Sequence, residues 1–266
     1  SGINHIVICP GGANISISAS IENDDFFKVF SCIDERSAGY LACGISEEIK
    51  QPVVLSCTGA TASRNLIPSM TEAFYRKIPI IFVTSMLGGN DFIGHLYAQN
   101  IDRTNIQNDI AKISVHLPII KDQDDEWFCR IQINKAIHEL SNEGGGPVHI
   151  NLPTSYSGSF NTKKLPNYKL IEKYYKNDNL PSIDHKRTII FIGSKYNLQK
   201  KSIVEIEKFC EKFNSFISYD HTSNYSGKYG LLTSLILSNF SKYNSVWKKL
   251  SPELIIHLGE VSGDYT

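Results

Sequence analysis

The sequence has no long hydrophobic run, no net charge and no leader-like start. No apolar stretch approaches the roughly 18 residues that a membrane-spanning helix needs. Lys plus Arg and Asp plus Glu both number 27, so no overall field attracts nucleic acid or an anionic membrane. A basic start followed by an apolar stretch and a small-residue cleavage site is missing as well. We therefore expect a cytoplasmic protein without nucleic-acid or membrane partners.

Several signatures of chemistry are also missing. The six cysteines form no CxxC pair, and the eight histidines show no metal-ligand spacing, so we predict no metal site in this chain. Most of the cysteines lie inside apolar strand or helix patterns, which is typical of buried free thiols in a reducing compartment. No G-x-S-x-G nucleophile elbow follows a strand, which disfavours a Ser-His-Asp hydrolase. The glycine-rich turns lack the spacing of a dinucleotide fingerprint and the Lys-Ser/Thr ending of a P-loop.

Short, β-branched segments that are apolar on both faces alternate with helical patterns, as in buried parallel sheets. The clearest helical pattern spans residues 35–49, with Asp34 as its N-cap. Two further helical patterns span about 61–76 and 125–142. The alternation predicts an α/β fold with a doubly wound six-stranded parallel sheet. The predicted strands are residues 4–9, 27–32, 52–57, 79–84, 115–120 and 147–151.

The composition changes after the sixth predicted strand. Residues 154–186 are rich in Ser, Asn, Lys, Tyr and Pro without a sustained period, which is typical of a linker. Residues 187–266 then begin a second, Rossmann-like α/β unit. Its last predicted strand, 254–258, is followed by few residues, so we expect this unit to be incomplete. The predicted organisation is a first domain over 1–153, the linker, and this central domain.

Loops that follow the carboxyl ends of strands carry the candidate functional residues, because ligands of open parallel sheets collect at that edge. These loops begin at Cys9, Asp34, Cys57 and Thr84. Glu35 is the most informative of their side chains, since it lies in the first turn of a helix directly after an apolar strand. An acidic residue in that place is also favoured by the helix dipole alone. The pattern leaves both interpretations open.

Taken in order, the motifs resemble the pyrimidine-binding domain of thiamine-diphosphate enzymes in the acetolactate-synthase superfamily. The resemblance spans about residues 2–153. It is carried by Gly2-Ile3-Asn4-His5-Ile6 to Pro10-Gly11, Asp34-Glu35-Arg36-Ser37-Ala38-Gly39-Tyr40, Thr58-Gly59-Ala60-Thr61-Ala62-Ser63-Arg64-Asn65, Glu72-Ala73, Ile78-Pro79-Ile80-Ile81, Gln99 and Gly146-Pro147-Val148-His149-Ile150-Asn151-Leu152-Pro153. Within the superfamily, these motifs are most similar to those of the menaquinone-pathway synthase (SEPHCHC synthase), which adds a succinyl semialdehyde unit to isochorismate.

The resemblance implies a site and a cofactor. Glu35 would be the catalytic carboxyl group that contacts N1′ of the aminopyrimidine ring and so activates thiamine diphosphate toward a 2-oxo acid. Pro10, Gly11, Thr58 and Gln99 would line the pyrimidine pocket. The diphosphate and its Mg²⁺ would be held by a separate domain with a Gly-Asp-Gly…Asn motif, which is absent from this sequence. The active site would then form at the interface of a homodimer or tetramer, and this chain alone would be inactive.

The sequence departs from the menaquinone synthase at two places. Where arginines hold substrate carboxylates in that enzyme, this chain has Ala13 and Leu87. Two missing charge-assisted contacts, each worth roughly 1.5–3 kcal/mol, favour a related decarboxylase or carboligase with another acceptor. SEPHCHC synthase stays the first alternative, and a non-catalytic binding or assembly module is the second. A flavin-containing relative is disfavoured, because the visible central segment shows no complete dinucleotide fingerprint.

Overall fold

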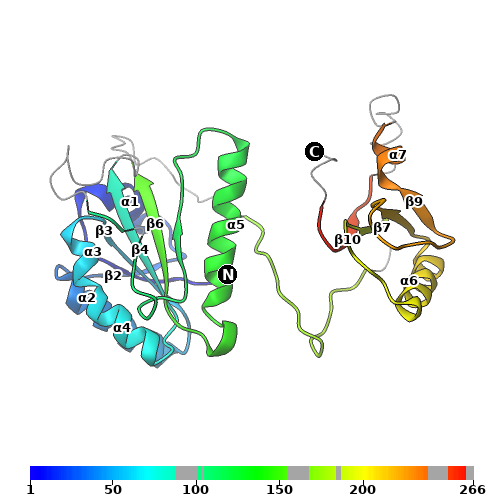
Figure 1. Cartoon of the computed structure of the whole chain (residues 1–266). Helices are drawn as coiled ribbons and strands as arrows, with labels where there is room; N and C mark the ends of the chain where they lie inside the picture. Colours follow the sequence, from blue (N-terminus) through cyan, green and yellow to red (C-terminus); the bar gives the residue numbers. More distant parts are fainter. Residues whose placement is uncertain (88–100, 104, 155–167, 184–186, 239–250, 262–266) are drawn as a thin grey trace. The chain divides into compact units, whose positions relative to one another are not determined.

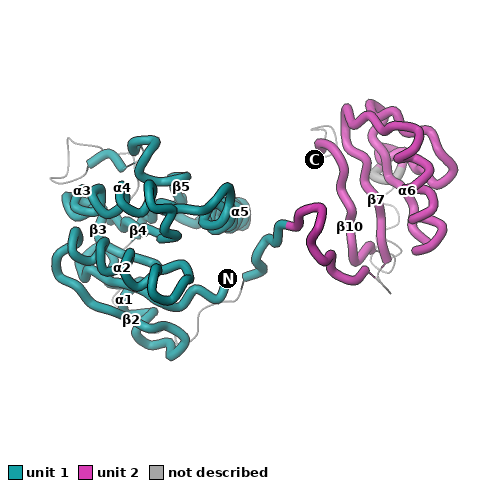
Figure 2. Tube along the Cα trace, turned by 90° about the horizontal axis from the view of Figure 1, so that it is seen from below, with its two compact units in different colours: residues 1–173 teal, residues 174–266 magenta. Residues whose placement is uncertain are grey.

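The chain forms two compact units, residues 1–173 and 174–266, which Figure 2 colours separately. The computed structural model describes residues 1–87, 101–103, 105–154, 168–183, 187–238 and 251–261.

The first unit contains a six-stranded, wholly parallel sheet in the order β2-β1-β3-β4-β6-β5 (Figure 1). This confirms the predicted doubly wound α/β fold. One predicted strand, 115–120, is much shorter than expected, because pairing with β6 ends at His116. The strands are β1 (His5–Ile8), β2 (Lys28–Ser31), β3 (Val53–Thr58), β4 (Ile80–Leu87), β5 (Ser114–His116) and β6 (Val148–Thr154).

Helices cover both faces of this sheet, because alternate strand residues point to opposite sides. On one face, Leu55 and Phe82 pack in a core with side chains of α2 and α4. On the other, Ile81 and Ile150 pack against α5, and Ile6 and Ile8 pack against α1. The helices are α1 (Ile15–Glu22), α2 (Glu35–Ile49), α3 (Thr61–Asn65), α4 (Ile67–Tyr75) and α5 (Gln123–Glu139), with short 3₁₀ turns η1 (Gly12–Asn14) and η2 (Asn142–Gly144).

Helix α2 begins and ends where the sequence indicated. The Asp34 carboxylate accepts a hydrogen bond from the Ser37 backbone N–H at 2.8 Å, which satisfies one of the free donors of the first turn. At the other end, Lys50 adopts a left-handed conformation (φ 53°) that terminates the helix. The predicted helix over 61–76 is instead two helices, α3 and α4. Pro68, near the start of α4, lacks the N–H that a continuous helix would use.

Gly39 fixes the close packing of α2 on α4. A Cβ atom at Gly39 would lie 1.8 Å from the Ser69 Oγ atom, and Ser69 is fully buried. Gly39→Ala should therefore lower the free energy of unfolding by about 1–3 kcal/mol, measured by urea denaturation. Gly44→Ala in the same helix is the matched control, since a Cβ there meets nothing within 4 Å. That variant should gain up to about 1 kcal/mol from helix propensity. Equal stabilisation by both changes would refute the packing argument.

The second unit contains a four-stranded parallel sheet in the order β10-β7-β8-β9. Its core is formed by buried side chains of β7 and β8 with Cys210 and Tyr225. The strand predicted at 254–258 is present as β10. The elements are β7 (Thr188–Ile192), α6 (Lys200–Phe213), β8 (Phe216–Tyr219), β9 (Gly230–Leu232), α7 (Thr233–Ser238) and β10 (Leu254–Leu258).

Residues 168–183, within the predicted linker, contain no helix or strand. The start of this segment nevertheless contacts α5. The Ile171 backbone N–H donates to Asn134 Oδ1 at 2.7 Å, and the Arg130 guanidinium lies over the Tyr168 ring, 5.4 Å from its centroid.

Candidate active site

The strand order places a topological switch point between β1 and β3. The chain passes from β1 to β2 on one side, and then returns to β3 on the other side of β1. Ligands of open parallel sheets bind in the crevice at the carboxyl ends of such strands. The Pro10–Gly11 turn follows β1, and Thr58 is the last residue of β3. Two of the predicted binding segments therefore lie at the expected edge of the sheet.

These two segments are in direct contact. A Cβ atom at Gly11 would lie 2.3 Å from Thr58 Cγ2, so only glycine allows the turns to approach this closely. The Asn14 side chain holds these two turns together through three hydrogen bonds. Its amide nitrogen donates to the Cys9 carbonyl at 3.0 Å and to Ser56 Oγ at 3.2 Å, while its Oδ1 accepts from the Gly11 N–H at 2.9 Å. Asn14 is fully buried, so this network holds the turn after β1 to the end of β3.

Glu35 lies at the same edge, as the first residue of α2. Its side chain is partly exposed, and its Oε2 accepts a hydrogen bond from the Asn65 amide nitrogen at 3.1 Å. Asn65 is the last residue of α3, the helix that follows Thr58. The Oε1 atom of Glu35 has no hydrogen-bond partner among the described residues. One carboxyl oxygen is thus held in place, while the other is available at the sheet edge.

The charge of Glu35 contributes to the raised pKa values of two thiols, those of Cys9 and Cys57. Burial raises the pKa of Cys9 to about 12, and the charge of Glu35 adds to the increase. Burial and the neighbouring Cys9 raise the pKa of Cys57, and Glu35 again contributes. Cys9 precedes Pro10 and Cys57 precedes Thr58, so the charge of Glu35 acts on the residue before each of the two turns. Both thiols stay protonated at neutral pH and are poor nucleophiles.

Ala13 lies in η1 and Leu87 ends β4, and the last residue of β6 connects these two segments. Thr154, at the end of β6, donates its hydroxyl to the Ala13 carbonyl at 2.6 Å and contacts the Met86 carbonyl at 3.2 Å. Leu87 follows Met86 and is 37% exposed. Neither the Ala13 nor the Leu87 side chain brings a charge to this edge of the sheet.

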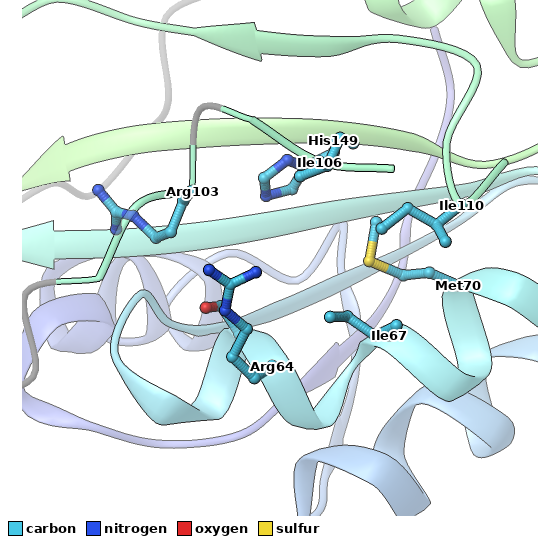
Figure 3. A pocket seen from close by; sticks show the side chains of 8 residues that line it. Arg64, Ile67, Met70, Arg103, Ile106, Ile110 and His149 are labelled. Atoms are coloured by element: carbon cyan, nitrogen blue, oxygen red, sulfur yellow. The ribbon is translucent and has the colours of Figure 1, made fainter. Parts of the chain in front are cut away.

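A cationic side chain lies on the opposite side of the Thr58 turn. Arg103 is 6% exposed, and burial lowers the pKa of its guanidinium group. A Cβ atom at Gly59 would lie 1.7 Å from Arg103 Nη1, so a larger residue there would displace the Arg103 side chain. Figure 3 shows Arg103 beside a small pocket, with its guanidinium pointing away from His149, and Arg64 rising from α3. No local pattern predicts this contact, because Arg103 lies 44 residues after Gly59 (103 minus 59) and follows no motif.

A buried hydrogen-bond network supports the sheet behind this pocket. His149, on β6, has one ring nitrogen 2.9 Å from Thr84 Oγ1 and the other 2.8 Å from Ser114 Oγ. Thr84 Oγ1 also donates to Asn151 Oδ1, and the Asn151 amide nitrogen donates to the Arg103 carbonyl at 2.7 Å. Burial lowers the pKa of His149 to about 3, with further contributions from His116 and Arg103. His149 is therefore a neutral structural residue.

One predicted site residue, Gln99, lies outside the described residues. Within the described part of the chain, no group of three or more His, Cys, Asp or Glu side chains could hold a metal ion. No helix in that part is long and apolar enough to cross a membrane.

Comparisons with known proteins agree with the motifs. Residues 1–106 match the family described as thiamine pyrophosphate enzyme, N-terminal TPP binding domain. The chain is 38% identical over 174 residues to the 2-succinyl-5-enolpyruvyl-6-hydroxy-3-cyclohexene-1-carboxylate synthase of Phocaeicola vulgatus, covering 65% of this chain and 31% of that protein. It is 27% identical to the Desulfitobacterium hafniense synthase of the same name, covering 97% of this chain and 48% of that protein.

A solved structure, benzoylformate decarboxylase from Polynucleobacter necessarius, is 17% identical with a TM-score of 0.49 and covers 97% of this chain and 48% of that one. The matched part of the chain spans 31% and 48% of the length of these two curated synthases. The similarity to thiamine pyrophosphate enzymes is carried first by residues 1–106, which match the model of their N-terminal TPP-binding domain.

Proposed function

We propose that this chain supplies the pyrimidine-binding half of the active site in a thiamine-diphosphate-dependent 2-oxo acid decarboxylase or carboligase. The observation that carries the proposal is that Glu35 begins α2 at the sheet edge where the Gly11 and Thr58 turns contact each other, and that it accepts a hydrogen bond from Asn65, in the helix after Thr58. A carboxyl group that is held by one oxygen and available through the other fits a ring nitrogen that must exchange a proton. A non-catalytic binding module would have no need for such a carboxyl group.

The residues of this chain would act on the pyrimidine ring. Bound thiamine diphosphate supplies a thiazolium carbon that adds to 2-oxo acids and accepts the electron pair left by loss of CO₂. Glu35 would hold or release a proton at N1′ of the aminopyrimidine. The Pro10–Gly11 turn and Thr58 would position the ring, because their mutual contact and Asn14 leave them little freedom. Gln99 is proposed as a further contact from the sequence resemblance alone.

The rest of the cofactor would be held elsewhere. The described part of this chain offers no cluster of ligands for Mg²⁺, so the diphosphate and its Mg²⁺ are assigned to another domain. The partial exposure of Glu35 supports a site that is completed by a partner subunit. We accordingly propose a homodimer or tetramer with the site at its interface, in the cytoplasm. Residues 1–266 alone would be inactive.

The acceptor is proposed to differ from isochorismate. The two curated relatives are named as synthases of a succinyl-substituted cyclohexene carboxylate. Ala13 and Leu87 contribute no positive charge at the two places where the resembled synthase has arginines. An uncharged acceptor, or one with fewer carboxylates, suits this edge better.

The experiment is a CO₂-release assay on the full-length protein with a panel of 2-oxo acids. We expect release that requires both thiamine diphosphate and Mg²⁺, and no product when isochorismate is the acceptor for 2-oxoglutarate. Efficient product formation from isochorismate would establish the synthase alternative instead. Cofactor-bound protein that releases no CO₂ from any member of the panel would favour the non-catalytic module.

A further inference from the structure

The Glu35 carboxyl group has a partner, Asn65, to which the sequence motifs assigned no role. Asn65 Nδ2 donates to Glu35 Oε2 at 3.1 Å, and this bond joins residues that are 30 positions apart. The bond connects the first residue of α2 to the last residue of α3. Because α3 follows Thr58, the contact links the proposed catalytic carboxyl group to the turn that would hold the ring.

We infer that Asn65 is a positioning residue, which orients the Glu35 carboxyl group toward N1′ of the pyrimidine. The inference rests on the proposed function of Glu35. The terminal torsion of a glutamate is broad and roughly two-fold, so the backbone of α2 alone does not fix the plane of the carboxyl group. A second contact is needed to hold that plane within the narrow range that proton transfer requires.

The chemistry of an amide explains why the donor matters. The Asn65 N–H occupies Oε2 as an acceptor, so a proton carried by the carboxyl group must reside on Oε1. That oxygen has no other partner among the described residues and is free to meet the ring. Asn65 thus determines which oxygen carries the transferable proton. Asp34 cannot take over this role, since its carboxylate has no N–H to donate and itself accepts a hydrogen bond from the Ser37 N–H.

The contact can first be tested without cofactor, in the apo chain. The side-chain amide signals of Asn65 should move with pH in ¹⁵N-correlated NMR spectra, because the acceptor oxygen belongs to a titrating group. The movement should vanish in Glu35→Gln. Asn65 signals that behave identically in both proteins would show that the hydrogen bond is absent in solution, and the inference would fall.

The functional test uses the full-length holoenzyme. Asn65→Ala should lower kcat roughly tenfold, with KM for the 2-oxo acid changed less than about threefold, because orientation and not substrate binding is lost. Asn65→Asp should be at least as slow, since it replaces the donor with a second carboxylate. Asn65→Gln retains the amide and should recover part of the rate.

Asn23→Ala is the matched control. Asn23 is also exposed, and its amide donates to the Ala19 carbonyl at 2.7 Å, away from the sheet edge that carries Glu35. It should keep the wild-type kcat. If Glu35→Gln is slow but Asn65→Ala has a kcat within twofold of wild type, Asn65 only ties two helices together and the inference is wrong. If Glu35→Gln is as fast as wild type, the proposed catalytic role of Glu35 is itself wrong, whatever the result for Asn65→Ala.

Discussion

Lowering the pH from 6.5 to 3 should remove about 4 kcal/mol of unfolding free energy from the first unit through His149 alone. The pKa of this imidazole falls from 6.5 to about 3 on folding, chiefly because burial disfavours the charged ring. Each unit of pKa difference corresponds to about 1.36 kcal/mol. The unfolded chain binds a proton in this pH range that the folded chain does not bind. The stability that neutral His149 contributes is therefore fully present above about pH 6.5 and is lost progressively as the pH falls toward 3.

The measurement is a set of urea denaturation curves between pH 7 and pH 4, compared with those of His149→Gln. The variant should be less stable at pH 7, because glutamine replaces a ring that bridges Thr84 and Ser114. Its stability should nevertheless fall less steeply on acidification, since glutamine does not titrate. Parallel pH dependences in the two proteins would mean that folding does not lower the pKa of His149, and its role as a neutral structural residue would be wrong.

Replacing Glu35 by Gln should reduce turnover of the full-length enzyme by about 10²–10⁴-fold. The amide keeps the shape of the side chain and can still meet Asn65, but it has no proton to exchange with the pyrimidine. Binding of thiamine diphosphate should weaken much less, because the diphosphate and Mg²⁺ contacts are assigned to another domain. Steady-state kinetics and calorimetry separate the two effects.

Glu48→Gln provides the matched control for that experiment. Glu48 is exposed and lies in the last turn of the same helix, at the opposite end from Glu35. Its replacement removes the same charge from α2 and should leave turnover within about twofold of wild type, as is usual for surface substitutions. Equal losses in both variants would point to the charge of the helix as a whole and not to the carboxyl group at its first turn.

Much of the fold could be predicted because the local signals agree with the tertiary structure. Helix α2 is an example, since its N-cap, its apolar period and its ending all appear within residues 34–50. Helix α1 was not predicted. Its Ile and Ser residues alternate as in a strand, and serine is a weak helix former. The Ser18 and Ser20 hydroxyls instead donate to carbonyls one turn earlier, and the Ile21 side chain packs on the sheet.

The candidate site was predicted less completely than the fold. Glu35, Gly11 and Thr58 belong to motifs, and strand order brings them to one edge. Asn14 and Asn65 were missed as functional residues because their contacts join segments distant in sequence. Asn14 Nδ2 reaches Ser56 across 42 positions, for example. No local pattern encodes such a pairing, since it exists only once the parallel sheet has formed.

The exchange rate of the proton at thiazolium C2 in the bound cofactor tests the central claim most directly. It is followed by NMR after dilution of the holoenzyme into deuterated water, with no substrate present. If Glu35 activates the cofactor, exchange in Glu35→Gln should slow in parallel with turnover, by about 10²-fold or more. Exchange as fast as in the wild-type holoenzyme would contradict the catalytic role, and Glu35 would then be only an acidic residue favoured at the start of a helix.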